Sequence, residues 1–377
     1  MREERRKRVV DAMVEAKLDW VVLAPSTNLE YLAGVKRRIP AYTRADHHGS
    51  WAEMAFLSAK NEMWYVAPRM VADFETINGE ATQVLRLEET KAVEPQLHGI
   101  LSRIGFSKGS VAIEDEVSAR AVMCLVDAAP EVSLREGISL FQEVRRVKTD
   151  EELEILRRAG RITDEAFADV VSQIRVGMSE WDIAGELEYQ MRRRGAEALS
   201  FPTVVYGYHE NRPSSIREYR EPRFAPIEDG TILAFDFGCV YEGYCSDFGR
   251  TVSIGEPNPK VHRFAKDLEE AHSLGIRELR AGVEATVVHQ AVWRALDEAG
   301  WGKYFVHRTG HGIGMDVHED PSLDASDATQ LEPSMVFTIE PSVLVEGGLW
   351  IRNEDVVVVG ENSGESLTQS SLGLVAL

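Results

Sequence analysis

One pattern repeats at a separation of 105 residues and limits the folds that the second half of this chain can adopt. Each copy has an Arg-x-Gly turn, a helix with an apolar residue at every fourth position, and a glycine that ends the helix. The first copy comprises Arg175, Gly177, Met178, Ile183, Leu187, Met191 and Gly195, and the second comprises Arg280, Gly282, Val283, Val288, Val292, Leu296 and Gly300. Solenoid repeats are much shorter than this. The repeat therefore predicts one αβ unit that is duplicated and packed about a pseudo-twofold axis.

Each copy also contains a pair of apolar segments that we expect to form strands. These segments are 231–235 with 250–254 in the first copy, and 335–339 with 356–359 in the second. Acidic residues occupy matching places in the two copies. Asp236 and Glu340 follow the inner strands, whereas Asp247 precedes the outer strand of the first copy and Glu354 that of the second.

A carboxylate at the end of a buried strand points toward the core, where an unpaired charge is costly. Each of these acids, taken alone, is most simply explained as an exposed or ion-paired residue. Four of them in matching positions, accompanied by His311 in the Gly-rich segment 309–314, favour a different explanation. Hard oxygen ligands dominate such a set, so the sequence predicts a site for two divalent cations.

The length of 377 residues exceeds what one hydrophobic core usually supports, so we expect two domains. The first part alternates between helix and strand, with a helix through Ala16, strands at 20–23, 63–66 and 111–113, and a helix from residue 28. The pattern changes near residue 144, and Thr149 with Glu152 forms a capping box at the start of a long helix. We therefore predict an α/β domain at 1–143 and an α+β domain at 144–377 that contains the duplication.

Charge and cysteine content limit the binding partners and the cellular compartment that we expect for the protein. Nucleic acids and anionic membranes are bound chiefly through Lys and Arg, so a net charge of −20 disfavours both as partners. Cys124, Cys239 and Cys245 cannot all pair with one another, which fits a reducing cytoplasm. Asp11 and Glu15 interrupt the region where a signal peptide is apolar, and no later segment reaches membrane-spanning length. We expect a cytoplasmic protein.

Several short motifs, in this order, resemble those of the pita-bread metallopeptidases, family M24. They are Asp236-Phe-Gly, Gly243-Tyr-Cys-Ser-Asp247-Phe-Gly-Arg-Thr251, His307-x-x-Gly-His311-Gly-x-Gly, Val317-His-Glu-Asp-Pro321, Ile339-Glu-Pro341 and Arg352-Asn-Glu-Asp355. The segment 28–34 and the stretch Arg146-Val-Lys-Thr-x-x-Glu further resemble the group of Xaa-Pro aminopeptidases, prolidases and creatinases. This resemblance spans nearly the whole chain. It implies a creatinase-like N-terminal domain and a pita-bread catalytic domain.

The resemblance also implies a set of metal ligands. Asp236 and Asp247 would bind one metal ion, His311 would bind the other, and Asp247 and Glu354 would bridge the pair, with Glu340 as a further ligand. All five residues are present, unlike in creatinase, which binds no metal. The implied cofactor is two divalent ions, with Mn²⁺ as the first choice and Co²⁺, Zn²⁺ or Fe²⁺ as alternatives.

The implied activity is that of an Xaa-Pro dipeptidase or aminopeptidase, in which a hydroxide that bridges the two metals cleaves the bond before proline. Glu340 would carry the proton from water to the leaving amine, and His318 would stabilise the oxyanion. His307 would lie near the oxyanion as a further catalytic residue and contact a carboxylate of the substrate; the alternative for this residue is a structural role. Arg352 would lie near the substrate and neutralise carboxylate charge behind the metals. Dimers are common in the group, so we expect a homodimer that acts on small peptides.

One segment departs from the pattern of the family. Proline-specific members carry a histidine after a Gly-x-Asn-x-x-x-Pro-like stretch, and Ser214 occupies its place here. Either His209, which with Tyr206 and Tyr208 is expected to border the substrate, takes over this contact, or the substrate differs. The alternative function is a metal-dependent hydrolase or lyase of a small non-peptide amide or osmolyte. A binding protein without catalysis is disfavoured, because such proteins have generally lost metal ligands.

Overall fold

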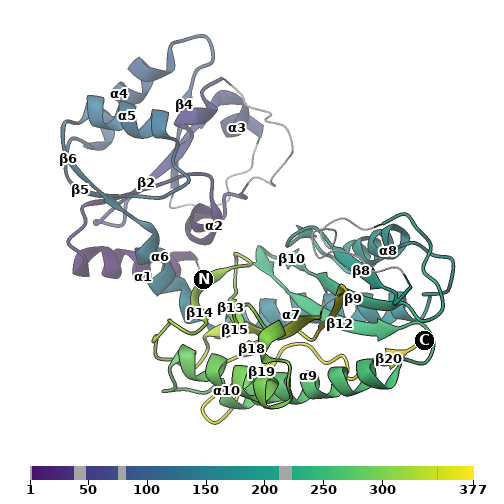
Figure 1. Cartoon of the computed structure of the whole chain (residues 1–377). Helices are drawn as coiled ribbons and strands as arrows, with labels where there is room; N and C mark the ends of the chain where they lie inside the picture. The colour runs from purple at the N-terminus through teal and green to yellow at the C-terminus, as the bar shows by residue number, and fades with distance from the viewer. Residues whose placement is uncertain (1, 38–47, 75–81, 212–222, 346) are drawn as a thin grey trace. The chain divides into compact units, whose positions relative to one another are not determined.

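A computed structural model describes residues 2–37, 48–74, 82–211, 223–345 and 347–377 (Figure 1). The chain forms two compact units, Met1–Arg145 and Arg146–Leu377. Ser214, where the sequence departs from the family pattern, lies outside the described residues.

The first unit is built around a mixed sheet with the strand order β4-β3-β2-β1-β5-β6. Strand β1 pairs in antiparallel orientation with β2 and in parallel orientation with β5, so the sheet follows the α/β alternation expected from the sequence. The strands are β1 (Trp20–Leu23), β2 (Met54–Ser58), β3 (Met63–Pro68), β4 (Thr82–Leu87), β5 (Lys108–Ile113) and β6 (Glu131–Glu136). The helices are α1 (Arg2–Glu15), α2 (Thr27–Ala33), α3 (Arg69–Phe74), α4 (Val93–Ile104), α5 (Ala119–Ala128) and α6 (Ile138–Arg146), with a short 3-10 helix at Ser50–Ala52. The strands predicted at 20–23, 63–66 and 111–113 are confirmed as β1, β3 and β5.

The helices of the second unit display the duplication directly. They are α7 (Asp150–Val171), α8 (Glu180–Arg193), α9 (Pro259–Glu278) and α10 (Ala285–Glu298), with a 3-10 helix at Gly302–Tyr304. Both ends of α10 lie 105 positions after those of α8, as the repeat predicts. Gly177 and Gly282, which open the two copies, have φ of +96° and +77°, a conformation that side chains with a Cβ rarely adopt. The glycines of the repeat are therefore required by the turns that start the helices.

The strands of the second unit also fall into two matching groups. Their orders are β20-β12-β9-β8 and β14-β13-β15-β18-β19, with two smaller sheets, β11-β10-β7 and β16-β17. The first group contains β8 (Val204–Tyr208), β9 (Ile232–Phe237), β12 (Phe248–Ser253) and β20 (Val375–Ala376); the second contains β13 (Gly310–Gly312), β14 (Glu319–Leu323), β15 (Val336–Ile339), β18 (Asp355–Val358) and β19 (Glu365–Ser366). The smaller sheets are made of β7 (Ala198–Leu199), β10 (Cys239–Tyr241), β11 (Tyr244–Cys245), β16 (Ser342–Val345) and β17 (Leu349–Arg352). The predicted strand pairs are confirmed as the antiparallel pairs β9 with β12 and β15 with β18.

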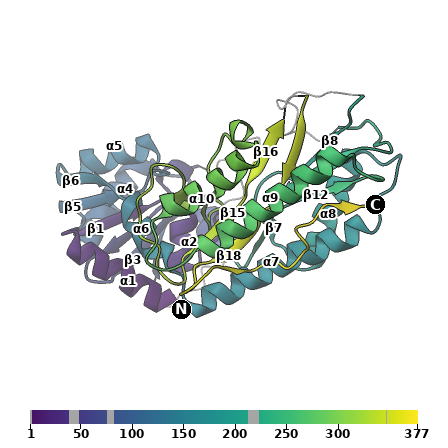
Figure 2. The ribbon, with the colours of Figure 1, turned by 60° about the horizontal axis from the view of Figure 1, so that its bottom comes forward.

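Helices and strands of the second unit enclose apolar cores. Phe167 of α7 contacts the rings of Phe235, Phe237 and Phe248 from β9 and β12. Leu187 of α8 is buried in the same cluster. Figure 2 shows α7 and α9 running across the strands, with the C-terminal segment between them. The strands are thus held by packed helices, and their ends are the places where polar side chains converge.

The two halves of the duplication meet at one pair of residues. Gly249 in β12 forms an isolated antiparallel bridge with Glu354, which lies next to β18. The amide of Glu354 donates to the carbonyl of Gly249 at 2.9 Å, and the amide of Gly249 donates back at 3.3 Å. This bridge brings together the strand ends that carry the predicted metal ligands.

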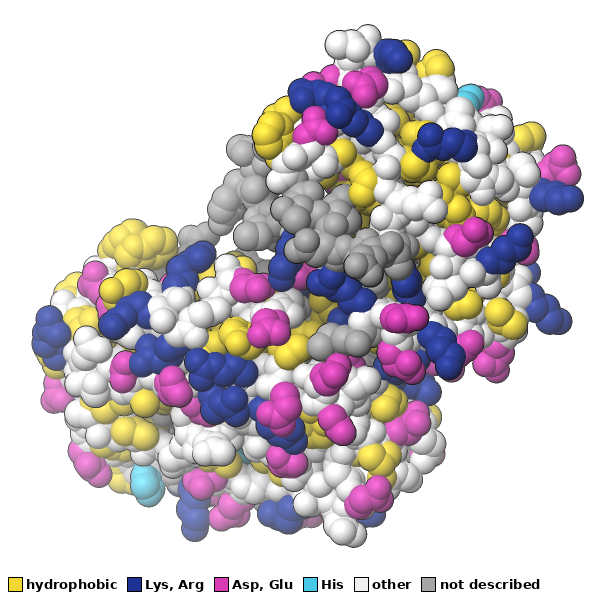
Figure 3. Space-filling view, turned by 180° about the vertical axis from the view of Figure 1, so that it is seen from behind, with side chains coloured by type: hydrophobic (Ala, Val, Ile, Leu, Met, Phe, Trp, Pro, Cys, Tyr) yellow, Lys and Arg dark blue, Asp and Glu magenta, His cyan; other side chains and the backbone are white. Residues whose placement is uncertain are grey.

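The surface carries charges of both signs. On the face shown in Figure 3, Asp and Glu side chains are interspersed with Lys and Arg rather than gathered into one acidic patch. Among the helices of the described ranges, none combines the length and the apolar character that crossing a membrane requires.

Candidate metal centre

The five predicted metal ligands come from strands, or from the residue next to a strand, in the second unit. Asp236 lies in β9 and His311 in β13. Asp247 directly precedes β12, Glu340 directly follows β15, and Glu354 directly precedes β18. Strand pairing places Asp236 opposite Gly249, and the Gly249–Glu354 bridge then links both halves. The register of the strands therefore brings the carboxylates of the two copies to one place.

Three of these residues form the tightest cluster. Asp247, His311 and Glu354 each offer a ligand atom, and these atoms all lie within 4.8 Å of one another. The Nε2 atom of His311 is 3.6 Å from Oδ2 of Asp247 and 3.5 Å from Oε1 of Glu340. The Nδ1 atom of His311 lies 3.0 Å from the carbonyl oxygen of Gly312 and can donate to it, which leaves Nε2 to accept a cation.

Arg352 is the cation that the carboxylates share. Its Nη2 atom donates to Glu340 at 2.7 Å, and it also lies 2.8 Å from Glu354 and 3.5 Å from Asp236. Although burial opposes its charge, the carboxylates of Asp236 and Glu354 raise the pKa of Arg352 well above its ordinary value. Arg352 thus neutralises part of the negative charge and also lines the neighbouring cavity.

The single positive charge of Arg352 cannot neutralise four carboxylates. Burial raises the pKa of Asp247 and of Glu354 well above the ordinary range of carboxyl groups, because their charged forms lack sufficient positive partners. The Oδ1 atom of Asp247 and the Oε1 atom of Glu354 are buried and have no hydrogen-bond partner among the described residues. Two orphaned carboxylate oxygens beside an imidazole nitrogen are the donor set that divalent cations bind. The residues fit a divalent-metal centre.

Glu340 differs from the other acids in its electrostatic surroundings. Burial acts to raise its pKa, but Arg352 and His311 outweigh that effect, and the net result is a pKa below the ordinary value. Burial also lowers the pKa of His311, to about 4, so this imidazole is neutral near pH 7. Glu340 is accordingly a carboxylate and His311 a neutral imidazole near pH 7.

A cavity of about 370 Å³ adjoins these residues. It is lined by Tyr206, Asp236, Tyr304, Val306, His307, Arg308, His318, Glu340, Ser342, Leu344, Trp350 and Arg352. Tyr206 and Trp350 contact each other edge to face, with ring centroids 6.1 Å apart. The cavity combines an apolar wall with a charged floor, as ligand-binding sites do.

Two histidines predicted to act in the reaction lie at this cavity. The ring of His318 is 4.2 Å from that of His311, and burial lowers its pKa. His307 has protein partners at both ring nitrogens: Nε2 is 2.6 Å from Oγ of Ser342, and Nδ1 is 2.6 Å from the carbonyl oxygen of Arg308. His318 therefore lines the cavity beside His311, whereas His307 forms hydrogen bonds within the wall of the cavity.

His209, expected to contact the substrate, lies elsewhere. It lines a separate small cavity of about 70 Å³ together with Glu180 and Arg223. Its Nε2 atom is 3.1 Å from the carbonyl oxygen of Asp229, and its Nδ1 atom accepts from the amide of Asn211. These contacts hold the ring beside the end of β8, and the structure does not bring it together with the metal ligands.

Other residues of the cavity were not foreseen from the sequence. Arg308 lies between His307 and the Gly-rich segment, with its Nε atom 4.0 Å from Glu340. Leu344 and Trp350 come from the hairpin of β16 and β17, which forms one wall. The position of Arg308 within the histidine motif is a signal that could have identified it. An apolar hairpin gives no comparable signal.

Comparisons with known proteins identify the family of this chain. The family model of metallopeptidase family M24 matches residues 154–361. The uncharacterized peptidase YqhT of Bacillus subtilis is 30% identical over 96% of both chains, and the Xaa-Pro dipeptidase of Pyrococcus furiosus is 27% identical over 99% of this chain and 100% of its own. Among solved structures, a dipeptidase from Pyrococcus horikoshii OT3 superposes with a TM-score of 0.87 at 28% identity, covering 99% of this chain and 100% of its own. The X-Pro aminopeptidase of Thermotoga maritima MSB8 superposes with a TM-score of 0.80 at 26% identity, covering 96% and 98%. The chain belongs to metallopeptidase family M24, in the group that contains the Xaa-Pro dipeptidases and X-Pro aminopeptidases.

Proposed function

We propose that this protein is a metal-dependent Xaa-Pro dipeptidase, which cleaves the bond before proline in dipeptides. The observation that carries the proposal is the meeting of two features in one place. Asp247, His311 and Glu354 converge on a common point, and the adjoining cavity offers both an apolar wall and the guanidinium of Arg308. The Xaa-Pro dipeptidases among the relatives of this chain support the same activity.

Two divalent cations, held by Asp236, Asp247, His311, Glu340 and Glu354, would lower the pKa of the attacking water and polarise the scissile carbonyl. Glu340 accepts the proton of that water, because its pKa lies below the ordinary value and it is ionised at neutral pH. The same carboxyl group then delivers the proton to the leaving nitrogen of proline. Its position at the cavity, 2.7 Å from Arg352, keeps it oriented during both transfers.

His318 stabilises the oxygen on which negative charge develops. Its side chain lines the cavity and is exposed, and partial burial of the ring lowers its pKa, so it is a neutral imidazole that still donates one N–H. His307 acts indirectly. Its contacts with Ser342 and with the carbonyl of Arg308 position the wall of the cavity from which Arg308 projects.

The two ends of a dipeptide match different parts of the cavity. Tyr206, Leu344 and Trp350 supply an apolar surface for the proline ring. Arg308 pairs with the carboxylate at the C-terminus of the substrate, which lies one residue beyond the scissile bond in a dipeptide. A longer peptide places a neutral amide there, so this pairing favours dipeptidase over aminopeptidase activity.

A substrate panel tests the proposal. Protein loaded with Mn²⁺ is assayed on an Xaa-Pro dipeptide, its C-terminal amide, longer Xaa-Pro peptides and small amide osmolytes. We expect the free dipeptide to have the highest kcat/KM, and we expect Arg308→Met to raise KM for the dipeptide but not for its amide. Arg294→Met, which changes an exposed arginine of α10, is the control. Activity on osmolytes alone would replace the proposal with the alternative small-amide hydrolase, and equal rates on dipeptide and longer peptides would favour an aminopeptidase.

We propose Mn²⁺ as the metal, since four carboxylates and one imidazole form an oxygen-rich set. Co²⁺, Zn²⁺ and Fe²⁺ are the alternatives, and activity of the metal-free protein reconstituted with each ion separates them. Higher activity with Zn²⁺ than with Mn²⁺ would contradict this assignment.

Two further expectations are a homodimer and a cytoplasmic location. The first rests on the resemblance to the prolidase group. The second is supported by the free cysteines Cys124, Cys239 and Cys245, all of which are buried. Sedimentation velocity and cell fractionation test them, and a monomer or a secreted protein would contradict them.

A further inference from the structure

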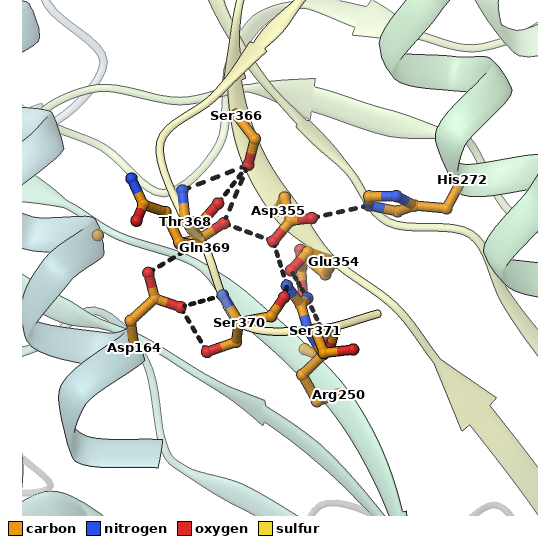
Figure 4. Close-up of polar contacts among 12 residues, drawn as sticks. Asp164, Arg250, His272, Glu354, Asp355, Ser366, Thr368, Gln369, Ser370 and Ser371 are labelled. Atoms are coloured by element: carbon orange, nitrogen blue, oxygen red, sulfur yellow. Dashed lines mark hydrogen bonds and ion pairs between the residues drawn. The ribbon is translucent and has the colours of Figure 1, made fainter. Parts of the chain in front are cut away.

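Arg250 lies behind the metal ligands and is almost fully buried, with 2% of its surface exposed. A guanidinium has five N–H donors, and here the three nitrogens donate to five acceptors. Nε donates to the carbonyl of Ser371 at 3.0 Å, Nη1 to the carbonyls of Gly249 at 2.8 Å and Glu354 at 2.6 Å, and Nη2 to Oδ1 of Asp355 at 2.6 Å and to the carbonyl of Ser370 at 2.8 Å. Figure 4 shows this arrangement. Such a complete set of contacts fixes the surrounding main chain.

Two of the five acceptors belong to the metal centre itself. Nη1 of Arg250 joins the carbonyls of Gly249 and Glu354, which are the two residues whose main chains bridge the halves of the duplication. Asp247 lies two residues before Gly249. The separation between the main chains that carry Asp247 and Glu354 therefore depends on Arg250. This separation matters because each of the two carboxylates has an oxygen that no hydrogen bond holds within the described part of the chain.

The other acceptors connect Arg250 to residues 366–371, which we call the C-terminal strap. Asp355 accepts from the hydroxyl of Thr368 as well as from Arg250. On the opposite side, the carboxylate of Asp164 in α7 accepts from the amides of Gln369 at 2.7 Å and Ser370 at 2.9 Å.

The strap lies between α7 and α9 (Figure 2), and Figure 4 shows Asp164 on one side of it and His272 on the other. The Nε2 atom of His272, from α9, lies 3.4 Å from Oδ2 of Asp355. The strap is thus held by Asp164 of α7 and by Asp355, and the carbonyls of Ser370 and Ser371 in turn accept from Arg250.

We propose that Arg250 and the C-terminal strap are positioning parts of the metal centre, which set the spacing of Asp247 and Glu354 and so the affinity for metal. This inference rests on the proposed function only in that the site binds metal. Arg250 differs from Arg352, which forms ion pairs with the carboxylates themselves. Its contacts at the centre are with main-chain oxygens, so it supports the ligands without occupying the places of the cations. Partners of this kind, outside the ligands, typically change metal affinity 10–100-fold when removed.

Two variants remove this support to different degrees. Arg250→Lys keeps the charge but cannot reproduce the planar fork that joins five acceptors. Asp164→Asn is milder. It replaces one of two acceptor oxygens with a donor, in a half-buried residue of α7 that is not a metal ligand. Leu187→Ala is the matched stability control, because it opens a cavity in the core around α8 and leaves the strap untouched.

The experiment is a titration of metal-free protein with Mn²⁺ by calorimetry, alongside the Tm of each metal-free variant. We expect Arg250→Lys to weaken Mn²⁺ binding about 10–100-fold, Asp164→Asn to weaken it by a smaller factor, and Leu187→Ala to lower Tm without changing the Kd. Wild-type Kd values in both Arg250→Lys and Asp164→Asn would overturn the inference, as would an equal loss of affinity in Leu187→Ala. If Arg250→Lys does not fold, the comparison of Asp164→Asn with Leu187→Ala decides by the same criteria. Wild-type protein that binds no Mn²⁺ would overturn the proposed function together with this inference.

Discussion

Gly249 and Glu354 donate main-chain hydrogen bonds to each other in both directions, and through this pair the two halves of a duplicated unit meet at the candidate metal centre. One partner is a glycine and the other a buried carboxylate. The close approach leaves room for the side chain of Arg352, which passes directly over Gly249. The main-chain pairing of Gly249 with Glu354 therefore also determines where the carboxylate of Glu354 lies.

The first prediction concerns that close approach. A Cβ atom at Gly249 would lie 2.9 Å from both Cδ and Nε of Arg352, whose position Glu340 and Glu354 also hold. We expect Gly249→Ala to displace Arg352, to lower the free energy of unfolding by about 1–3 kcal/mol and to reduce kcat/KM. Gly185→Ala is the control, because a Cβ there meets nothing within 4 Å on an exposed helix position. It should leave activity unchanged and stabilise by up to about 1 kcal/mol.

The second prediction separates stability from function at Asp247. In the metal-free protein this carboxylate is buried with one unpartnered oxygen, so its charge is unfavourable without a cation. We expect Asp247→Asn to stabilise the metal-free protein by about 0.5–2 kcal/mol and to abolish the rise in Tm that Mn²⁺ produces in the wild type. Calorimetric melting with and without Mn²⁺ measures both effects. A variant that melts lower than the metal-free wild type would show that Asp247 has a favourable structural partner.

The third prediction is the pH dependence of the metal-free protein. Burial raises the pKa of Asp247 and of Glu354, so the folded state holds protons that the unfolded chain releases near pH 4. Above that pH these two carboxyl groups bind more protons in the folded state than in the unfolded state, so their contribution to stability falls as pH rises toward the folded pKa values. Buried histidines such as His311, whose pKa is lowered to about 4, contribute in the opposite sense. Metal affinity changes in the opposite sense, because binding requires the deprotonated carboxylates. The Tm of the wild type is compared with that of Asp247→Asn between pH 4 and 8. The stability of the variant relative to the wild type should increase as pH rises, and identical pH dependences in the two proteins would count against the prediction.

The fourth prediction assigns His318 to the reaction rather than to metal binding. Its ring packs against His311 and lines the cavity, but it is not part of the cluster of Asp247, His311 and Glu354. We expect His318→Ala to lower kcat by about 10²–10³ while metal content, measured by elemental analysis, stays at the wild-type level. His98→Ala, which changes a half-buried histidine of the first unit, is the control. Loss of metal from His318→Ala would mean that the residue is needed to hold the ligands.

Local periodicity explains how much of the fold could be predicted. The spacing of apolar residues and glycines predicted α8 and α10, because a helix and its terminating glycines depend on neighbours a few positions away. Acids at the ends of apolar segments, in matching positions of the 105-residue repeat, indicated a metal site because buried carboxylates need positive partners. These inferences required no knowledge of contacts between distant strands.

The remaining features depend on contacts between distant residues. The hairpin that carries Leu344 and Trp350 forms a cavity wall only because it folds back beside β8 and β9, and its apolar residues resemble those of any core strand. His209 follows β8 closely in sequence, yet its contact with Asp229 keeps it at a separate cavity. Arg250 was visible only as part of a motif, because its five acceptors come from three separate stretches of the chain.

The rate of Xaa-Pro dipeptide hydrolysis as Mn²⁺ is added to the metal-free protein decides whether this protein is a metal-dependent Xaa-Pro dipeptidase. We predict negligible hydrolysis without metal, a rise that ends near two equivalents of Mn²⁺, and no rise in Asp236→Ala. Full activity in the metal-free protein, or no hydrolysis of any Xaa-Pro dipeptide at saturating metal, would contradict the assignment of this protein as a metal-dependent Xaa-Pro dipeptidase.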